Sequence, residues 1–304
     1  MNSTVDHFRR TIIEIHGKSG AEWLSRLPGV ISDCERRWSL TAQPPFGNLS
    51  YNYVAPARRS DGAPTVLKLG VPNREFRTEI EALRLFDGDG SVCMLDAEAD
   101  QGCLLLEYLK PGTPLSDVED DSTASSIAAR VMRQLWRPAP PGHSFPSVAD
   151  WASGLERLRQ RFGGTSGPLP QSLVEEAEGR FAELLSSMET PVLLHGDLHH
   201  GNILAAERQP WLAIDPKGVV GEPAYEVGAL LRNIEPRLTA ETPPVRILER
   251  RVHQLSEELG FDRERLRAWG LAQAVLSAWW SIEDHGRGWE WAISCAQLLR
   301  EIEI

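Results

Sequence analysis

Three short apolar runs in the middle of the chain each border a polar side chain that carries oxygen. The run at residues 192–194 leads into a loop that carries Asp197, and Asn202 follows five positions later, directly before a second apolar run. A third run, at residues 211–214, ends at Asp215, thirteen positions after Asn202. Short apolar runs are typical of buried strands, so we expect the three polar side chains to lie at strand ends. Carboxylate and amide oxygens are ligands that Mg2+ prefers, together with water and substrate phosphates.

The order of these three residues is the order found in protein kinases. There an aspartate of the catalytic loop receives the substrate hydroxyl, while an asparagine of that loop and a later aspartate hold the metal ions. By this pattern Asp197 orients an acceptor hydroxyl and accepts its proton, and Asn202 and Asp215 bind Mg2+. Phosphoryl transfer depends mainly on positioning and charge neutralisation, so we expect Asp197 to act more as an aligner than as a strong base.

The same region resembles the aminoglycoside phosphotransferase superfamily, and within it the branch of the streptomycin 6-phosphotransferases and hydroxyurea phosphotransferases. The resemblance rests on residues 195–202, 214–217 and 221–226, and a similar pattern runs through most of the chain. It implies an α+β fold of the protein-kinase-like, two-lobe kind, with a small antiparallel sheet in the N-terminal lobe and a helical C-terminal lobe. It also implies ATP, bound between the lobes, and Mg2+ as cofactors.

The activity that the resemblance implies is phosphate transfer from ATP to a hydroxyl of an antibiotic. The acceptor would be the 6-hydroxyl of streptomycin, or hydroxyurea, and the result would be resistance. Two alternatives stay open. The fold and loop are shared with kinases of choline, homoserine and sugars, so the acceptor could be another small hydroxylated metabolite. The chain could also be a nucleotide-binding protein that no longer transfers phosphate.

One lysine, Lys68, lies in an apolar stretch at residues 64–70 that predicts a strand. A buried cation is costly unless it is paired, so Lys68 needs an anionic partner, unless it points into solvent from an edge strand. The helix expected next carries an apolar stripe of Phe76, Ile80 and Leu83. Glu79 flanks that stripe and is the expected partner, with Glu75 as the second choice. In kinases such a pair holds the lysine on the α- and β-phosphates.

Three further positions are expected to touch the nucleotide. A strand with alternating side chains is predicted at residues 49–54, and the Ser50 hydroxyl would help nearby backbone amides to bind phosphate. Farther along, a buried strand gives way to a Pro-Gly turn, which the resemblance identifies as the hinge between the lobes. There we expect the main chains of Glu107 and Leu109 to hold the adenine.

The hinge also sets the expected domain boundary. Residues 1–109 would form the nucleotide-binding lobe, and residues 110–304 a helical lobe with the catalytic loop and the substrate site. The spacing of apolar residues and the positions of Pro and Gly predict the helices. The expected helices span residues 1–40, 122–136, 148–162, 171–188, 221–232 (a start at 221–224 with proline in the first turn, continued by 225–232), 243–259, 262–282 and 288–302.

Lys217 departs from the Asp-Phe-Gly sequence of protein kinases, because it follows Asp215 and a proline. Its ammonium could offset the charge that builds on the transferred phosphoryl group, which makes Lys217 a candidate catalytic residue. The alternative is a salt bridge within the loop. Glu226, in a segment that resembles a helix start, is expected to serve local geometry rather than chemistry.

The histidines near Asp197 allow a different reading, in which His195, His199 and His200 join Asp197 in the transition-metal site of a hydrolase. This reading leaves Asn202 without a role, and no further His or Cys group downstream completes such a site. We therefore expect His195 to pack and to hydrogen-bond the loop backbone, and the other two to be loop residues or neighbours of the substrate.

Two adjacent indoles, Trp279 and Trp280, lie near two carboxylates, Glu283 and Asp284, toward the end of a predicted helix. Aromatic faces and acids suit a polyhydroxylated cation, so this group could form a wall of the substrate site. Ordinary core packing by tryptophan, beside a solvated acidic helix end, explains the pattern equally well.

Length, charge and composition indicate which classes of partner the chain could bind. With 304 residues the chain can form two lobes, and its formal net charge of −11 argues against nucleic acid as the main partner. A small-molecule substrate is expected; the acidic balance weakly favours a cationic one, or simply reflects solubility. No apolar run is long enough for a membrane span, and the start lacks the pattern of a secretory signal. Four scattered cysteines fit free thiols in the cytoplasm. The oligomeric state is not fixed by the sequence.

Overall fold

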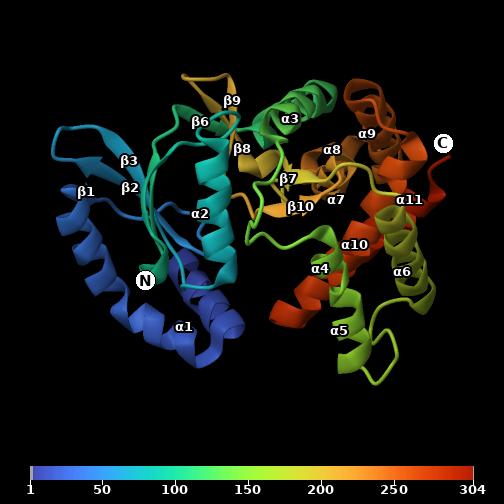
Figure 1. Ribbon diagram of the computed structural model, residues 1–304, viewed down its shortest axis with the longest axis horizontal. Helices are drawn as coiled ribbons and strands as arrows, with labels where there is room; N and C mark the ends of the chain where they lie inside the picture. The colour runs from blue at the N-terminus through green and yellow to red at the C-terminus, as the bar shows by residue number, and fades with distance from the viewer. Residues whose placement is uncertain (1–2, 304) are drawn as a thin grey trace. The chain divides into compact units, whose positions relative to one another are not determined.

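The computed structural model describes residues 3–303 of the chain (Figure 1). The chain divides into two compact units, Met1–Gly112 and Thr113–Ile304. The division falls a few residues after the expected boundary at 109/110, within β6 (Pro111–Pro114), the strand in which the chain passes from one unit to the other. The first unit is built on an antiparallel sheet and the second is mainly helical.

The sheet of the first unit has five strands in the order β1-β2-β3-β5-β4, all antiparallel to their neighbours. Its strands are β1 (Leu40–Ala42), β2 (Tyr53–Arg59), β3 (Pro64–Leu69), β4 (Met94–Glu98) and β5 (Cys103–Glu107). The prediction of a strand at residues 49–54 is wrong in position, because β2 begins only at Tyr53. Tyr53 pairs with Leu69, the last residue of β3, so the preceding residues have no partner in that strand.

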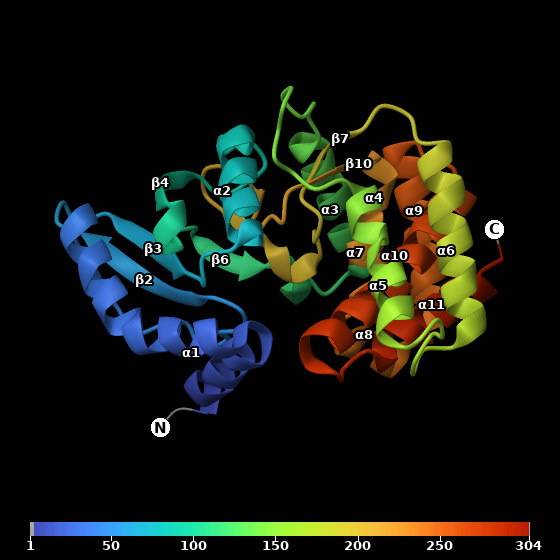
Figure 2. The same cartoon turned by 60° about the horizontal axis from the view of Figure 1, so that its bottom comes forward.

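A helix covers each face of this sheet. Successive side chains of a strand point to opposite faces, and Leu67 and Leu69 pack into an apolar core with α1 (Ser3–Trp38). Lys68, between them, points to the other face and meets α2 (Arg74–Phe86). Both views show the sheet between the two helices (Figure 2). Burial of Lys68 therefore follows from its place in a central strand under α2.

Helix α1 confirms the predicted N-terminal helix, with one interruption. At Gly17 the backbone turns to φ 54° and ψ −128°, a non-helical conformation that glycine adopts at little cost. Beyond the break the helix continues to Trp38, where the basic side chains of Arg36 and Arg37 lie in its last turn.

The second unit is organised around α10 (Arg263–His285), most of whose residues are buried. This helix packs against α5, α6, α7, α9 and α11. The other helices are α3 (Asp121–Leu135), α4 (Val148–Ala152), α5 (Gly154–Arg161), α6 (Gln171–Ser186), α7 (Val227–Arg232), α8 (Pro236–Glu241), α9 (Pro244–Leu259) and α11 (Glu290–Glu301). Among residues 3–303, no helix combines the length and the apolar character that crossing a membrane requires.

Two predicted helices differ from those observed. The helix expected at residues 148–162 is divided at Ser153 into α4 and α5. Gly154, at the start of α5, packs closely on α10, because a Cβ there would lie 2.9 Å from a methyl group of Leu276. The helix expected to start at residues 221–224 and to continue through 225–232 does start with Pro223, but as a 3-10 turn (Pro223–Glu226) that becomes α-helical only in α7 (Val227–Arg232). The short helix α8, which starts with a proline, was not predicted.

Four short strands frame the loops that carry the polar residues. β7 (Val192–Leu194) pairs with β10 (Val219–Gly221), and β8 (Ile203–Ala206) pairs with β9 (Trp211–Ala213). Asp197 follows β7, Asn202 directly precedes β8, and Asp215 follows β9. The expectation that all three residues lie beside strand ends is confirmed.

A buried ion pair ties α3 to α9. Arg251 is fully buried, and its guanidinium donates to the two carboxylate oxygens of Asp121 at 2.6 and 3.1 Å. It also donates to the backbone oxygens of Leu230 and Asn233. Both charges are removed from water, so the loss of one partner would leave the other uncompensated in the interior.

We expect Asp121→Ala to lower the free energy of unfolding by about 3–5 kcal/mol, because it leaves the buried Arg251 cation without its carboxylate partner. Urea denaturation followed by circular dichroism measures this. The matched control is Glu249→Ala, which removes the partner of the exposed Arg246 within α9 and should change the free energy by less than about 1 kcal/mol. Equal losses in the two variants would contradict the assignment.

Candidate active site

The loop after β7 is held by a buried carboxylate. Glu226, 1% exposed, accepts hydrogen bonds from the backbone N–H groups of His195 and Gly196 at 2.7 and 2.9 Å. Burial raises the pKa of Glu226 to about 7, although these two N–H donors favour the charged form and act in the opposite direction. Glu226 thus serves local geometry, as expected, and the geometry it serves is that of the loop carrying Asp197.

His195 joins this loop to the segment that carries Asp215. Its Nε2 lies 2.8 Å from the backbone oxygen of Ile214, and its Nδ1 accepts a hydrogen bond from the N–H of Asp197 at 3.2 Å. The N–H of Lys217 donates to the backbone oxygen of His195 at 2.8 Å. Burial lowers the pKa of His195 to about 4, so the ring is neutral near pH 7 and carries its proton on Nε2. The expected packing role of His195 is confirmed.

Asn202 is fixed by its amide nitrogen, which donates to the backbone oxygen of Asp197 at 2.9 Å. Its own backbone oxygen accepts from the N–H of Ile214 at 2.9 Å. With the nitrogen engaged, the side-chain oxygen of Asn202 is the atom suited to a cation. Asp215 has a φ of 61°, a left-handed conformation that is costly for a non-glycine residue and that recurs at functional sites.

These residues fit Mg2+ by their chemistry. One amide oxygen and one carboxylate are hard ligands, and Mg2+ completes its shell with water and substrate phosphates. The hydrogen bonds through His195 and Ile214 bring the segments of Asn202 and Asp215 together. Metal binding by the two side chains stays a prediction.

An arginine that the sequence did not reveal holds Asp197. One guanidinium nitrogen of Arg232, the last residue of α7, donates to Oδ1 of Asp197 at 2.7 Å. The other donates to the side-chain oxygen of Gln273 at 2.7 Å, and the amide nitrogen of Gln273 lies 3.4 Å from the backbone oxygen of Tyr225. Asp197 is therefore positioned from α7 and α10. The contact spans 35 positions along the chain and has no local sequence signal.

In the first unit, Lys68 and Glu79 form the expected pair. Lys68 is 2% exposed, and its Nζ lies 2.5 Å from Oε1 of Glu79, which is also buried. Asn73 caps the start of α2 by accepting from the N–H of Phe76, which fixes where the helix that carries Glu79 begins. Of the two glutamates considered, Glu79 is the one that pairs with Lys68. Their contact with ATP phosphates stays a prediction.

The other nucleotide positions also lie in the first unit. Ser50 is exposed in the segment before β2, not in a strand. The N–H of Glu107 donates to the backbone oxygen of Cys93 at 3.0 Å, so a main-chain contact between Glu107 and adenine would have to use its carbonyl. The side chain of Glu107 accepts from the N–H of Cys93, and Leu109 is buried. Adenine binding by Glu107 and Leu109 stays a prediction.

The three histidines near Asp197 lie in different surroundings. Both ring nitrogens of His195 contact the backbone, and Nδ1 of His199 accepts from the N–H of Gly201 at 3.1 Å. His200 is buried against Asp121, with 4.0 Å between Nε2 and the carboxylate, and burial lowers its pKa to about 3. Among the residues described, no three His, Cys, Asp or Glu side chains group as a metal site would require. The engaged ring nitrogens of His195 argue against the hydrolase reading.

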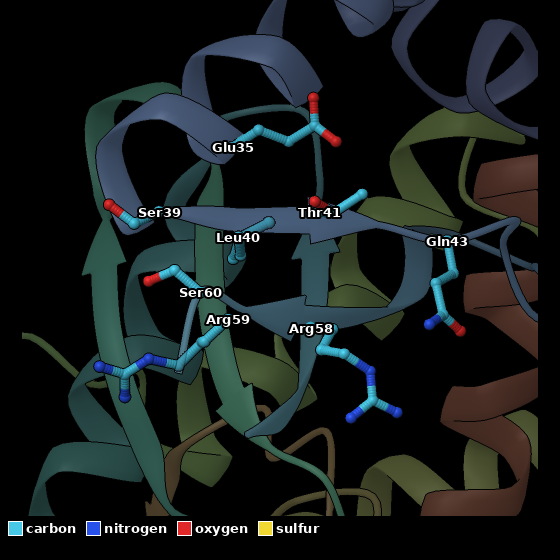
Figure 3. Close-up of a pocket in the computed structure, with 8 residues that line it drawn as sticks. All are labelled: Glu35, Ser39, Leu40, Thr41, Gln43, Arg58, Arg59 and Ser60. Atoms are coloured by element: carbon cyan, nitrogen blue, oxygen red, sulfur yellow. The ribbon is translucent and has the colours of Figure 1, made fainter. Parts of the chain in front are cut away.

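A surface hollow of about 400 Å3 lies at the β1 edge of the sheet in the first unit (Figure 3). Its lining contains none of the residues predicted to act in binding or catalysis. The residues that line it are Glu35, Ser39, Leu40, Thr41, Gln43, Arg58, Arg59 and Ser60. The candidate site therefore rests on side-chain arrangement rather than on this hollow.

Comparison with known sequences points to one family. The family described as aminoglycoside/hydroxyurea antibiotic resistance kinase matches residues 37–285. A streptomycin 6-kinase of Streptomyces glaucescens is 34% identical over 287 residues, covering 93% of this chain and 92% of that protein. A hydroxyurea phosphotransferase of Kitasatospora aureofaciens is 35% identical over 272 residues, covering 88% of this chain and 77% of that protein.

Solved structures support the fold. The aminoglycoside phosphotransferase APH(4)-Ia superimposes with a TM-score of 0.65 at 14% identity, covering 90% of this chain and 98% of its own. The choline kinase LicA from Streptococcus pneumoniae superimposes with a TM-score of 0.62 at 13% identity, covering 91% and 98%. At such low identity the likeness establishes the fold alone, and the predicted protein-kinase-like α+β fold is confirmed.

The raised pKa of Glu226 predicts a pH dependence of stability. The unfolded chain releases this proton near pH 4.5 and the folded chain only near pH 7, so the contribution of Glu226 to stability is full below pH 4.5 and is lost as the pH rises through 7. Glu226→Gln lacks this titration. We expect the free energy of unfolding of the wild type, minus that of Glu226→Gln, to fall by roughly 2–3 kcal/mol between pH 5 and pH 8.

Urea denaturation at several pH values measures this difference. Glu249→Gln, a substitution in an exposed ion pair, is the control and should give a nearly flat difference over the same range. A flat difference for Glu226→Gln would show that Glu226 titrates near its ordinary pKa.

Proposed function

The chain belongs to the aminoglycoside/hydroxyurea antibiotic resistance kinase family, and from this premise we propose that it uses ATP and Mg2+ to phosphorylate streptomycin at its 6-hydroxyl, or hydroxyurea. As a member of this family it is a phosphotransferase with an alcohol group as acceptor. ATP as the donor, the need for Mg2+ and the identity of the acceptor are the parts that we propose. We also place the protein in the cytoplasm, where ATP is available.

The observation that carries the proposal is that hydrogen bonds from two sides hold Asp197 in place. Arg232 engages Oδ1, and the N–H of Asp197 bonds to the ring of His195, so the carboxylate has a fixed place. The acceptor oxygen attacks the γ-phosphorus of ATP, its proton passes to Asp197, and the bond to the β–γ bridging oxygen breaks to release ADP. Because Arg232 already neutralises part of its charge, Asp197 contributes chiefly by alignment.

The remaining predicted site residues would neutralise the negative charge of the phosphates. Asn202 and Asp215 would hold Mg2+, which when bound neutralises the phosphate oxygens. Lys68, kept in place by Glu79, would bind the α- and β-phosphates. Lys217 would offset the charge on the transferred group, while its N–H keeps the loop attached to His195.

The test is a screen for ADP release with streptomycin, hydroxyurea, other aminoglycosides and choline, followed by 31P NMR of the product. We expect Mg2+-dependent turnover with streptomycin or hydroxyurea, and a loss of at least about a hundredfold in Asp197→Asn. Turnover with choline alone would favour the kinase of another metabolite, and no turnover with any acceptor would favour a non-catalytic nucleotide-binding protein. Full turnover in Lys217→Ala would remove Lys217 from the mechanism.

Arg232→Met should lower kcat by roughly 10- to 100-fold, because Asp197 loses the contact that orients its carboxylate. The KM for ATP should change by less than about threefold, since Arg232 contacts no residue expected to bind the nucleotide. Steady-state kinetics at saturating acceptor measures both values. The control is Arg237→Met, because Arg237 donates to the backbone oxygens of Ser116, Val118 and Glu119. Equal kcat values for the two variants would contradict this role.

A further inference from the structure

A column of aromatic rings runs from the core of the second unit outward. Phe181 stands 6.0 Å from Trp269, and Trp269 stands 5.2 Å from Tyr225, both in edge-to-face contacts. Tyr225 lies 6.2 Å from Trp151, and Trp151 makes an edge-to-face contact with Trp280 at 5.4 Å. The three inner rings are buried and the two outer ones are half-buried. The outer rings, Trp151 and Trp280, therefore pack against the buried core through Tyr225.

The outer end of this column reaches the catalytic loop. A Cβ at Gly196 would lie 2.7 Å from Cη2 of Trp151, so the indole leaves no room for a side chain there. Gly196 directly precedes Asp197 and has a φ of 87°, which favours glycine. The edge of Trp151 is thus one residue away from the group that orients the acceptor hydroxyl.

The two adjacent tryptophans, Trp279 and Trp280, lie in different environments. Trp279 is 1% exposed and belongs to the core, while Trp280 is half-buried and packs against Trp151. Glu283, the carboxylate next to them, accepts two hydrogen bonds from Arg157, at 2.9 and 3.1 Å. Its charge is already compensated, so an incoming cation would be recognised by the indole faces rather than by Glu283.

We propose that Trp151 and Trp280 form one wall of the acceptor site and select a cyclic polyol that carries guanidinium or ammonium groups. The proposal rests on the proposed function and concerns its acceptor. In an edge-to-face pair neither ring covers both faces of the other, so indole face remains for a cation. The rings are held before the acceptor arrives, which limits the entropy lost on binding. A small neutral acceptor such as hydroxyurea offers no charge to this wall.

The experiment compares Trp280→Leu with the wild type. We expect KM for streptomycin to rise about tenfold, and the ratio of kcat/KM for streptomycin to that for hydroxyurea to fall by a similar factor. Isothermal titration calorimetry with streptomycin, in the absence of nucleotide, should show a matching rise in Kd. Trp280→Phe keeps an aromatic face and should recover part of the binding, which separates the effect from a loss of folding.

Glu283→Gln is the matched control one helical turn away, because it removes the carboxylate and keeps both indoles. Its KM for streptomycin should stay within about twofold of the wild type. A tenfold rise in Glu283→Gln with no change in Trp280→Leu would overturn the proposal in favour of recognition by the acid.

The remaining outcomes separate this proposal from the proposed function. If the wild type phosphorylates streptomycin and Trp280→Leu leaves both KM and Kd unchanged, the wall is refuted and the function stands. If only hydroxyurea is phosphorylated and streptomycin does not bind, the wall is again refuted. If no acceptor is phosphorylated, the proposed function fails, and calorimetric binding of streptomycin that depends on Trp280 would still support the wall.

Discussion

The candidate site depends on a carboxylate placed where water does not reach it. Glu226 receives two consecutive backbone N–H groups at the end of β7, and these groups would otherwise be buried without partners. The pairing of β7 with β10 does not reach them, because it stops at Leu194. The turn of the chain at His195 and Gly196 is therefore set by one side chain from another segment. Because Glu226 is buried, its charged form is disfavoured and its pKa is raised.

Other hydrogen bonds connect this loop to the rest of the site. His195 joins the loop to the segment that carries Asp215 through hydrogen bonds with the backbone of Ile214 and Lys217. Arg232 holds the Asp197 carboxylate and is itself held by Gln273, and Trp151 packs against Gly196. Phosphoryl transfer relies on placement more than on strong acid or base chemistry, so a loop held at several points suits it.

Local rules explain what the sequence could and could not predict. The pairing of Lys68 with Glu79 was predictable, because a lysine in a central apolar strand needs a partner and the stripe of α2 limits the choice. The contact of Arg232 with Asp197 was not, since it joins residues 35 positions apart and Arg232 looks like any polar helix end. The same holds for Trp151, whose proximity to Gly196 arises from tertiary packing. The division at Ser153 was likewise not predicted, and Gly154, which follows it, lies against α10 with no room for a side chain.

The most direct test of this account is the turnover number of Glu226→Gln at pH 8, where Glu226 is charged, with ATP and the acceptor that the enzyme phosphorylates. An amide can accept one of the two N–H groups but turns a donor toward the other, so the loop would lose its position while the side chain keeps its size. The account predicts a fall in kcat of roughly a hundredfold with the protein still folded. A folded Glu226→Gln protein with the kcat of the wild type would contradict it.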